Sequence, residues 1–211
     1  MSGPWLVSYV VLWGLVLFQG AVIFVLLRQL GLMYMGTAQG VSRDGLAAGA
    51  RAPEFTLPDP AGRPVSLAGF AGRPLLLVFG STTCAPCRGL IPDLNAFARE
   101  RAAELQVLYL SRGEAEETRR FIEELDVRVP VAVHPDMALP DQYKARVTPF
   151  AFVIDAEGIV RAKGLSNNRN HLEALLRVAN DESRRAARRS HNGAHAAQPH
   201  EIPPVATARK G

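Results

Sequence analysis

The first part of the chain is a long apolar run without a charged residue. From Trp5 to Leu27 it reads WLVSYVVLWGLVLFQGAVIFVLL, which is about 23 residues free of Asp, Glu, Lys and Arg. A helix of that length crosses a hydrocarbon core of roughly 30 Å. The run is longer than the apolar part of a secretory signal peptide, and no Lys or Arg precedes it. We therefore expect residues 1–30 to be an N-terminal transmembrane anchor, held in the membrane by residues 5–27.

The segment after the run has no sustained hydrophobic period. Residues 31–51 are rich in Gly and Ala and are predicted to be a tether. Beyond them, residues 52–180 alternate short apolar runs with amphipathic ones, which predicts one compact α/β domain with helices on both faces of a sheet. The expected strands flank a turn at 58–62, cover 75–80, 105–110 and 129–136, and flank a second turn at 156–158; the expected helices cover 84–105, 113–126 and 170–180.

The C-terminal segment 181–211 is polar and charged, with almost no large apolar side chain. Such a segment cannot bury enough surface to offset the entropy lost on ordering, so we expect a disordered tail. The net charge of the chain is +4 and its pI about 9.4, and four arginines of this tail supply much of the excess: Arg184, Arg185, Arg188 and Arg189. Because the basic residues gather in the tail rather than over the domain, we expect no nucleic-acid partner.

The two cysteines of the chain, Cys84 and Cys87, lie between a predicted buried strand and a predicted amphipathic helix. In a first helical turn, residues three apart share one face with their Cβ atoms roughly 5–6 Å apart, so a small adjustment permits a disulfide. The unpaired N–H groups at a helix start favour a thiolate at Cys84, and Arg88 adds a nearby positive charge. Pro86 suits a first turn because it needs no N–H partner there. We predict that Cys84 is the exposed attacking thiol and Cys87 the buried resolving thiol.

Three other interpretations of the pair stay open. A zinc site would need two further ligands, and His191, His195 and His200 all lie in the tail. Two incidental core cysteines would be an unusual coincidence at a strand–helix junction. A peroxidase using Cys84 alone would need a nearby base, and no histidine is close in sequence, although Ser81, Thr82 and Thr83 offer hydroxyl groups. The disulfide exchange that we favour needs no metal and no organic cofactor.

A second chemical element is Thr148–Pro149, at the entry to the apolar strand FAFVID. Proline is tolerated at the first position of a strand because no ladder N–H is needed there. A cis bond before Pro149, placed beside the cysteine loop, would keep a backbone N–H from capping the sulfur. It would also leave the backbone of Thr148 free to pair with an extended substrate segment. The alternative is a trans proline that only begins the strand.

Three segments in this order, APEFTLPDPAGRPVSL, LLLVFGSTTCAPC and VTPFAFVIDAEGIV, resemble the TlpA/ResA type of membrane-anchored thioredoxin-like proteins. Within that type, the anchor ending in LLRQLG and Thr83 before the first cysteine are similar to the MauD family of methylamine utilisation accessory proteins. The resemblance spans about residues 5–180. It implies a thioredoxin-like fold, a central mixed sheet flanked by helices, preceded by one transmembrane helix. It also implies a cis bond at Pro149, redox-active cysteines, and supporting or substrate-contacting roles for Thr83, Ala85, Pro86, Thr148 and Pro149.

The resemblance further implies a compartment and partners. The domain would lie outside the cytoplasmic membrane, in the periplasm, exchange disulfides with exported client proteins, and be recycled by a redox partner. For the MauD family the implied client is the disulfide-rich small subunit of methylamine dehydrogenase. This orientation is opposite to the one that Arg28, directly after the apolar run, predicts by the positive-inside rule; that rule is weak for a single arginine before a long domain.

The chain departs from the family at positions that matter for proton transfer. Thr83 stands where thioredoxins commonly have Trp, and Val78 and Leu90 stand where thioredoxins or TlpA/ResA-type reductases often have a carboxylate that accepts the proton of the buried thiol. An apolar surrounding disfavours a thiolate at Cys87. The sequence therefore predicts thiol exchange without predicting its direction. Two alternatives stay open: a tethered assembly factor that holds its client along the Pro149 edge without using the cysteines, and a thiol peroxidase.

Overall fold

The computed structural model describes Gly3, Trp5 and residues 8–25 and 44–196 of the 211-residue chain. Ser8–Val25 form one helix that is long and apolar enough to cross a membrane. Its large apolar side chains are exposed, Phe18 at 71% among them, so the helix is not covered by the rest of the described protein. The remaining parts of the predicted anchor, and most of the predicted tether, lie outside the described residues.

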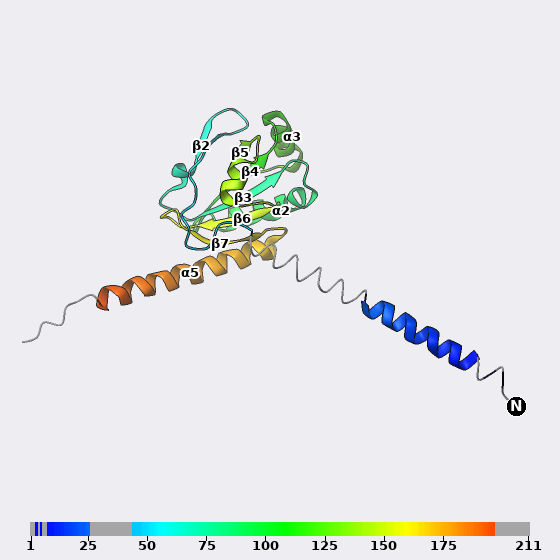
Figure 1. The fold of residues 1–211 in the computed structure, drawn as a ribbon. Coiled ribbons are helices and arrows are strands. Elements are labelled where there is room, and N and C mark those ends of the chain that lie inside the picture. Colours follow the sequence, from blue (N-terminus) through cyan, green and yellow to red (C-terminus); the bar gives the residue numbers. More distant parts are fainter. Residues whose placement is uncertain (1–2, 4, 6–7, 26–43, 197–211) are drawn as a thin grey trace, which may run out of the picture.

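The domain is built on a five-stranded mixed sheet (Figure 1). The strand order is β5-β4-β3-β6-β7; β3 is parallel to β4 and β4 to β5, whereas β6 is antiparallel to both β3 and β7. A separate antiparallel pair, β1 and β2, precedes the sheet. The elements are β1 (Thr56–Pro58), β2 (Pro64–Ser66), the 3₁₀ helix η1 (Leu67–Phe70), β3 (Leu75–Ser81), α2 (Ala85–Glu100), β4 (Gln106–Arg112), α3 (Ala115–Leu125), β5 (Val131–His134), α4 (Ala138–Tyr143), β6 (Phe150–Ile154), β7 (Val160–Leu165) and α5 (Arg169–Ala196).

Alternating residues of the central strand divide the core into two clusters. On β3, Leu76 and Val78 face α2, α3 and α5, while Leu75, Leu77 and Phe79 face α4 and η1. The strand is buried on both faces, which explains why its sequence is continuously apolar rather than alternating. The predicted α/β architecture with helices on both faces is thus confirmed.

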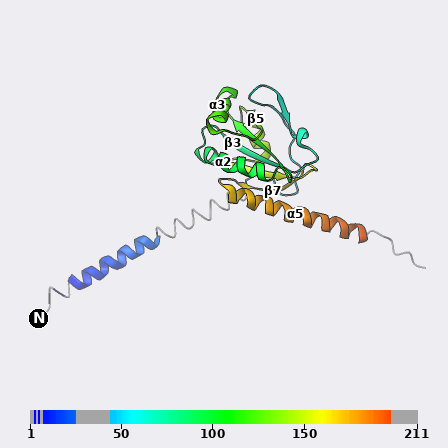
Figure 2. The same ribbon diagram turned by 180° about the vertical axis from the view of Figure 1, so that it is seen from behind.

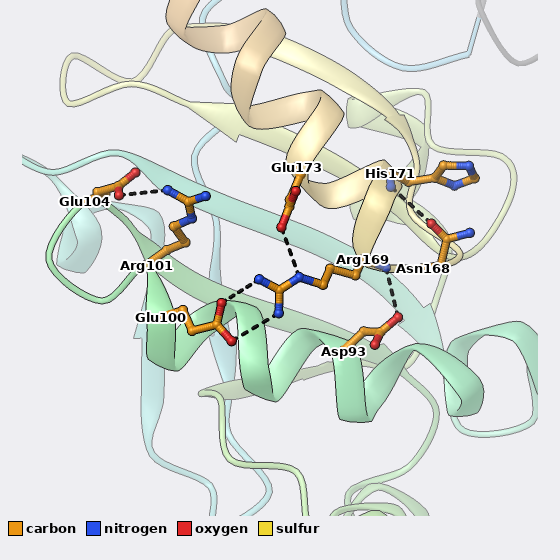
Figure 3. A network of polar contacts seen from close by, with 8 residues as sticks. All are labelled: Asp93, Glu100, Arg101, Glu104, Asn168, Arg169, His171 and Glu173. Carbon is orange, nitrogen blue, oxygen red and sulfur yellow. Dashed lines mark hydrogen bonds and ion pairs between the residues drawn. The ribbon is translucent and has the colours of Figure 1, made fainter.

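Helix α2 begins at Ala85, directly after Cys84, so its position determines where both cysteines lie. Its buried positions after Cys87 are Leu90, Ile91, Leu94 and Phe97, one stripe at helical spacing that packs on the sheet. The far end of α2 is joined to α5 through Arg169, as Figure 3 shows. The Arg169 guanidinium bonds Glu100 of α2 and, at 2.9 Å, Glu173 of its own helix. The Arg169 N–H also donates to Asp93 Oδ2 at 2.9 Å, so the start of α5 is fixed against α2.

Residues 44–51 were expected to be part of the tether, yet they are built into the domain. Gly45 N–H donates to the Lys144 carbonyl at 2.8 Å, and the Gly45 carbonyl accepts from Lys163 Nζ at 2.8 Å. Gly45 has a φ of +79°, and a Cβ there would lie 2.8 Å from Phe150, so this contact requires glycine. Glycine here reflects close packing rather than flexibility, and the domain begins before the predicted boundary at residue 52.

Residues 181–196 were expected to be disordered, and that expectation is wrong. They continue α5, which leaves the domain as a long projecting helix in Figures 1 and 2. Among the described side chains of α5, the fully buried ones end at Ala179, so the extension beyond it is held less by packing than the first part of the helix. It is sustained because adding residues to an existing helix avoids the cost of nucleation, and Glu182 pairs with Arg185 one turn on. The rest of the predicted tail, 197–211, lies outside the described residues.

Candidate active site

The loop between β3 and α2 is shaped by Ser81, the last residue of the strand. Ser81 is 3% exposed, its carbonyl accepts the N–H of Cys84 at 3.3 Å, and its Oγ lies 3.2 Å from Thr83 Oγ1. Thr83 N–H also points to the Ser81 hydroxyl, at 3.4 Å. Thr83 itself is exposed, and the residue that caps α2 is Cys84.

Cys84 and Cys87 form a disulfide across the first turn of α2, with their Cα atoms 5.2 Å apart. Cys84 is half-buried, whereas Cys87 is fully buried. The N–H of Cys87 donates to Cys84 Sγ at 3.3 Å, which is the contact expected of a sulfur that caps a helix. Ala85 and Pro86 are exposed between them, with the proline in the first turn. Cys84 is thus the more accessible of the two sulfurs, and the order in which Cys84 meets the client and Cys87 resolves stays a prediction.

The Thr148–Pro149 segment lies against the same disulfide. The bond before Pro149 is cis, as the family resemblance implied. The carbonyl oxygen of Thr148 is 3.6 Å from Cys84 Sγ, a position in which it can accept a hydrogen bond from the reduced thiol. Thr148 is half-buried and Pro149 is buried, with the Pro149 carbonyl accepting the Ser166 N–H at 3.1 Å. All seven predicted site residues therefore gather at the junction of β3, α2 and β6: Thr83, Cys84, Ala85, Pro86, Cys87, Thr148 and Pro149.

Arg88 follows the buried cysteine but is not a free positive charge. Its guanidinium pairs with Glu124 of α3 and lies 5.9 Å from the centre of the Phe121 ring. Its Nη1 also reaches the Thr82 carbonyl at 3.5 Å. The charge that was predicted to favour the thiolate is thus offset by a carboxylate, and the side chain instead joins α2, α3 and the preceding loop.

The surroundings of the pair on the α2 side of the sheet are apolar. Val78 and Leu90, the two positions noted for the absence of a carboxylate, are fully buried in one hydrophobic cluster. Tyr109, on the neighbouring strand opposite Val78, is buried there too, and its hydroxyl has no hydrogen-bond partner in the described protein. Burial raises the pKa of Tyr109 far above its ordinary value, with the Ser81 backbone acting in the opposite direction, so this phenol stays protonated.

Sequence reasoning missed a group of polar residues on the other side of the sheet. His134 was considered remote from the pair, yet β5 ends with it beside Arg112, which in turn lies beside Ser81. No sequence motif signals this row; it follows only from the register of three parallel strands. Within the described residues, no cluster of three or more His, Cys, Asp or Glu side chains has the arrangement of a metal site.

Comparisons with known proteins agree with this geometry. The model of the AhpC/TSA family matches residues 48–163. Methylamine utilization protein MauD of Paracoccus versutus is 37% identical over 177 residues, which cover 80% of this chain and 86% of that protein. Thiol-disulfide oxidoreductase ResA of Bacillus cereus is 26% identical over 137 residues, covering 64% of this chain and 79% of its own.

A solved structure extends the similarity to three dimensions. The crystal structure of a DsbE-type thiol:disulfide interchange protein from Chlorobium tepidum superposes with a TM-score of 0.60 at 27% identity. The match covers 65% of this chain and 98% of that one. The resemblance inferred from three short segments and a thioredoxin-like fold are thereby confirmed.

Proposed function

Because the chain belongs to the AhpC/TSA family and is a thiol–disulfide oxidoreductase with a thioredoxin-like fold, we propose that it exchanges disulfides with exported proteins from a membrane anchor. The observation that carries the proposal is the Cys84–Cys87 disulfide at the start of α2, with one sulfur half-exposed and the other buried. The half-exposed sulfur lies beside the Thr148 carbonyl, where an extended client segment can pair with the backbone.

The exchange needs only the two sulfurs of this chain. In the reduced protein, the Cys84 thiolate attacks a client disulfide; a mixed disulfide forms, and the other client sulfur leaves as a thiolate that takes up a proton. The Cys87 thiolate then attacks Cys84 Sγ, which releases the second client sulfur and closes the Cys84–Cys87 disulfide. One disulfide is broken and one is formed, and two electrons pass to the client. The reverse sequence oxidises a client dithiol. We propose that no metal or organic cofactor takes part.

The local structure supports Cys84 as the attacking group. Its sulfur receives the Cys87 N–H at 3.3 Å, and a thiolate accepts such a bond more strongly than a thiol does. The position at the N-terminus of a 16-residue helix adds the positive end of the helix dipole. With Arg88 neutralised by Glu124, these two backbone effects are the stabilising ones that the described structure offers to the thiolate.

For the cellular setting, we propose a single pass through the cytoplasmic membrane with the domain on the periplasmic side. The uncovered apolar helix at 8–25 supports an anchor. The client that we propose follows from the MauD relatives: an exported protein with several disulfides, namely the small subunit of methylamine dehydrogenase. A separate dithiol–disulfide carrier would then recycle the cysteine pair.

The decisive experiment uses the full-length chain in detergent and follows reduction of a protein disulfide by dithiothreitol. We expect the wild type to accelerate the reaction, Cys84→Ser to lower the rate to the uncatalysed level, and Cys87→Ser to accumulate the mixed disulfide on Cys84. Ser166→Ala, which changes a buried hydroxyl outside the loop, is the control and should retain the activity.

Two outcomes would replace the proposal. Full maturation of the client in cells with the Cys84→Ser/Cys87→Ser double variant would indicate an assembly factor that holds its client. Consumption of hydrogen peroxide by the reduced protein, faster than its exchange with disulfides, would indicate a thiol peroxidase.

A further inference from the structure

Three parallel strands place a row of polar side chains at the edge of the sheet where the cysteines lie. In the register of β3, β4 and β5, Ser81 is opposite Arg112 and Arg112 is opposite His134. These are the last residues of their strands, and the carboxyl ends of parallel strands are the usual place for a ligand in an open α/β sheet.

A small cavity opens on the α4 side of this row. Its volume is about 90 Å³, and its wall includes Arg112, His134, Met137, Arg146 and Thr148. Thr148 is the residue whose carbonyl lies 3.6 Å from Cys84 Sγ, so the cavity and the redox site share one wall. A molecule held against the disulfide along Thr148 would therefore reach into the cavity with a neighbouring side chain.

His134 brings an unpartnered atom to this cavity. The side chain is 2% exposed, and its Nδ1 lies 2.9 Å from the Asp136 carbonyl, which can only accept a hydrogen bond. The proton is therefore on Nδ1. Burial lowers the pKa of His134, with Arg112 acting in the same direction and the Asp136 backbone in the other, so the ring is neutral and Nε2 is a bare lone pair.

The two arginines at the cavity, Arg112 and Arg146, have no carboxylate partner in the described residues. Arg63, Arg88, Arg128, Arg161 and Arg169, by contrast, each pair with an acid. Arg112 Nη1 lies 3.4 Å from the sulfur of Met137, and within the described residues neither Arg112 nor Arg146 makes an ion pair. Both are exposed, so their guanidinium groups are available to an incoming anion.

We propose that this cavity receives a carboxylate side chain of the client, an Asp or Glu next to the cysteine that Cys84 attacks. The inference rests on the proposed function and adds a determinant of specificity to it. A cavity of about 90 Å³ has room for the three heavy atoms of a carboxylate. Guanidinium forks bind such a group in bidentate fashion. The negative charge of the entering carboxylate also favours protonation of His134 at Nε2, and the protonated Nε2 then donates a hydrogen bond to that carboxylate. The positive charges of Arg112 and Arg146 disfavour this protonation, whereas Asp136 favours it.

The test compares three disulfide-bonded peptides that differ only in the residue beside the attacked cysteine, which is Glu, Gln or Lys. The probe is the full-length protein in its reduced form, and the readout is kcat and KM for exchange with each peptide. We expect kcat/KM for the Glu peptide to exceed that for the Gln peptide about tenfold, through KM, with the Lys peptide poorest. The preference for Glu should increase as the pH falls from 7.5 towards 6, and His134→Gln should remove that increase.

Two double variants distinguish an effect of the cavity on peptide preference from an effect of the net charge of the protein. Arg112→Gln/Arg146→Gln should equalise kcat/KM for the Glu and Gln peptides, through a loss that is larger for the Glu peptide. Arg99→Gln/Arg177→Gln removes the same charge from exposed sites on α2 and α5 and should keep the preference for Glu.

Three results would overturn the inference. The first is equal kcat/KM for the Glu and Gln peptides with the wild type, and the second is a preference for Glu that survives in Arg112→Gln/Arg146→Gln. The third is binding of free sulfate at the cavity without any preference among the peptides, which would indicate a site for small anions. Exchange of the Gln peptide by the wild type would still support the proposed function in each case, whereas exchange of no peptide would overturn both.

Discussion

The two sides of the sheet differ sharply where they meet the cysteine pair. On the α2 side, Cys87 is fully buried, and the hydrophobic cluster on this face contains Val78, Leu90 and Tyr109, whose hydroxyl has no partner in the described residues. On the α4 side, His134 and the exposed residues Arg112 and Arg146 line one small cavity. The disulfide therefore lies between apolar residues on the α2 side and charged residues on the α4 side.

This difference separates two tasks that one site must perform. Among the described residues, the cluster on the apolar side contains no carboxylate to exchange protons with the buried thiol, so the reactivity of the pair depends on the helix start and on backbone N–H groups. The charged side touches the Thr148 segment and can distinguish one client from another. In this chain the chemistry and the choice of client therefore depend on opposite faces of the same strands, and each can be altered without the other.

The largest expected effect comes from placing a charge on the apolar side. Val78→Asp puts a carboxyl group at a position with no exposure and no cationic partner, which costs several kcal/mol of unfolding free energy, about 3 or more. Denaturant unfolding of the full-length chain in detergent measures it. Val78→Ala, which removes volume without adding charge, should cost less, about 1–2 kcal/mol. If Val78→Asp caused no loss of unfolding free energy, the α2 side would be polar, and the difference between the two sides of the sheet would not hold.

A smaller loss is expected where the apolar side is tightest. A Cβ at Gly80 would lie 2.0 Å from the Tyr109 hydroxyl oxygen and 2.4 Å from the ring carbon that bears it. Because the ring is held by stacking on Phe121, Gly80→Ala should lower the unfolding free energy by about 1–3 kcal/mol. Gly89, exposed on α2 with no atom near its Cβ, is the matched control. There the change to Ala should add about 0.5–1 kcal/mol of stability.

Two buried tyrosines, one on each side, give the most direct comparison. Tyr143 of α4 donates its hydroxyl proton to the Pro53 carbonyl at 2.8 Å, whereas the Tyr109 hydroxyl has no partner in the described residues. Tyr143→Phe should therefore cost about 1 kcal/mol of unfolding free energy, because it leaves the carbonyl unpaired. Tyr109→Phe should cost nothing or stabilise the protein slightly. Equal losses in the two variants would show that Tyr109 has a partner of its own on the α2 side.

The parts of the molecule that the sequence predicted are those controlled by local patterns. The buried strand before Cys84, the helical stripe from Leu90 to Phe97 and the β6–β7 hairpin each follow from spacing within one segment. The placement of Thr148 and Pro149 beside the cysteines is a long-range feature, yet the family resemblance implied it. The sequence was therefore sufficient to predict chemistry that depends on one strand and one loop.

The group of charged residues on the α4 side could not be predicted from the sequence, for a physical reason. His134 and Arg112 become neighbours only through the register of two parallel strands, and nothing in either segment specifies that register. Helix α4 has six residues and includes Pro140, so its hydrophobic period is too short to detect. The extension of α5 was missed because composition indicates how much surface a segment can bury and does not indicate whether a helix already formed will continue.

The smallest expected effect tests the charge state on the α4 side through stability alone. Burial lowers the pKa of His134 below its ordinary value, so the unfolded chain binds a proton here at a higher pH than the folded protein does. Stability therefore rises with pH around this group: its contribution is present above about pH 6.5 and is lost as the pH falls below that value. Unfolding free energies measured from pH 7.5 to 5 should show this decline in the wild type and a shallower one in His134→Gln. His171, an exposed histidine at the start of α5, is the control, and His171→Gln should keep the wild-type slope. A decline of equal steepness in His134→Gln would mean that the pKa of His134 is the same in the folded and the unfolded protein, and a lowered pKa would then no longer distinguish the α4 side.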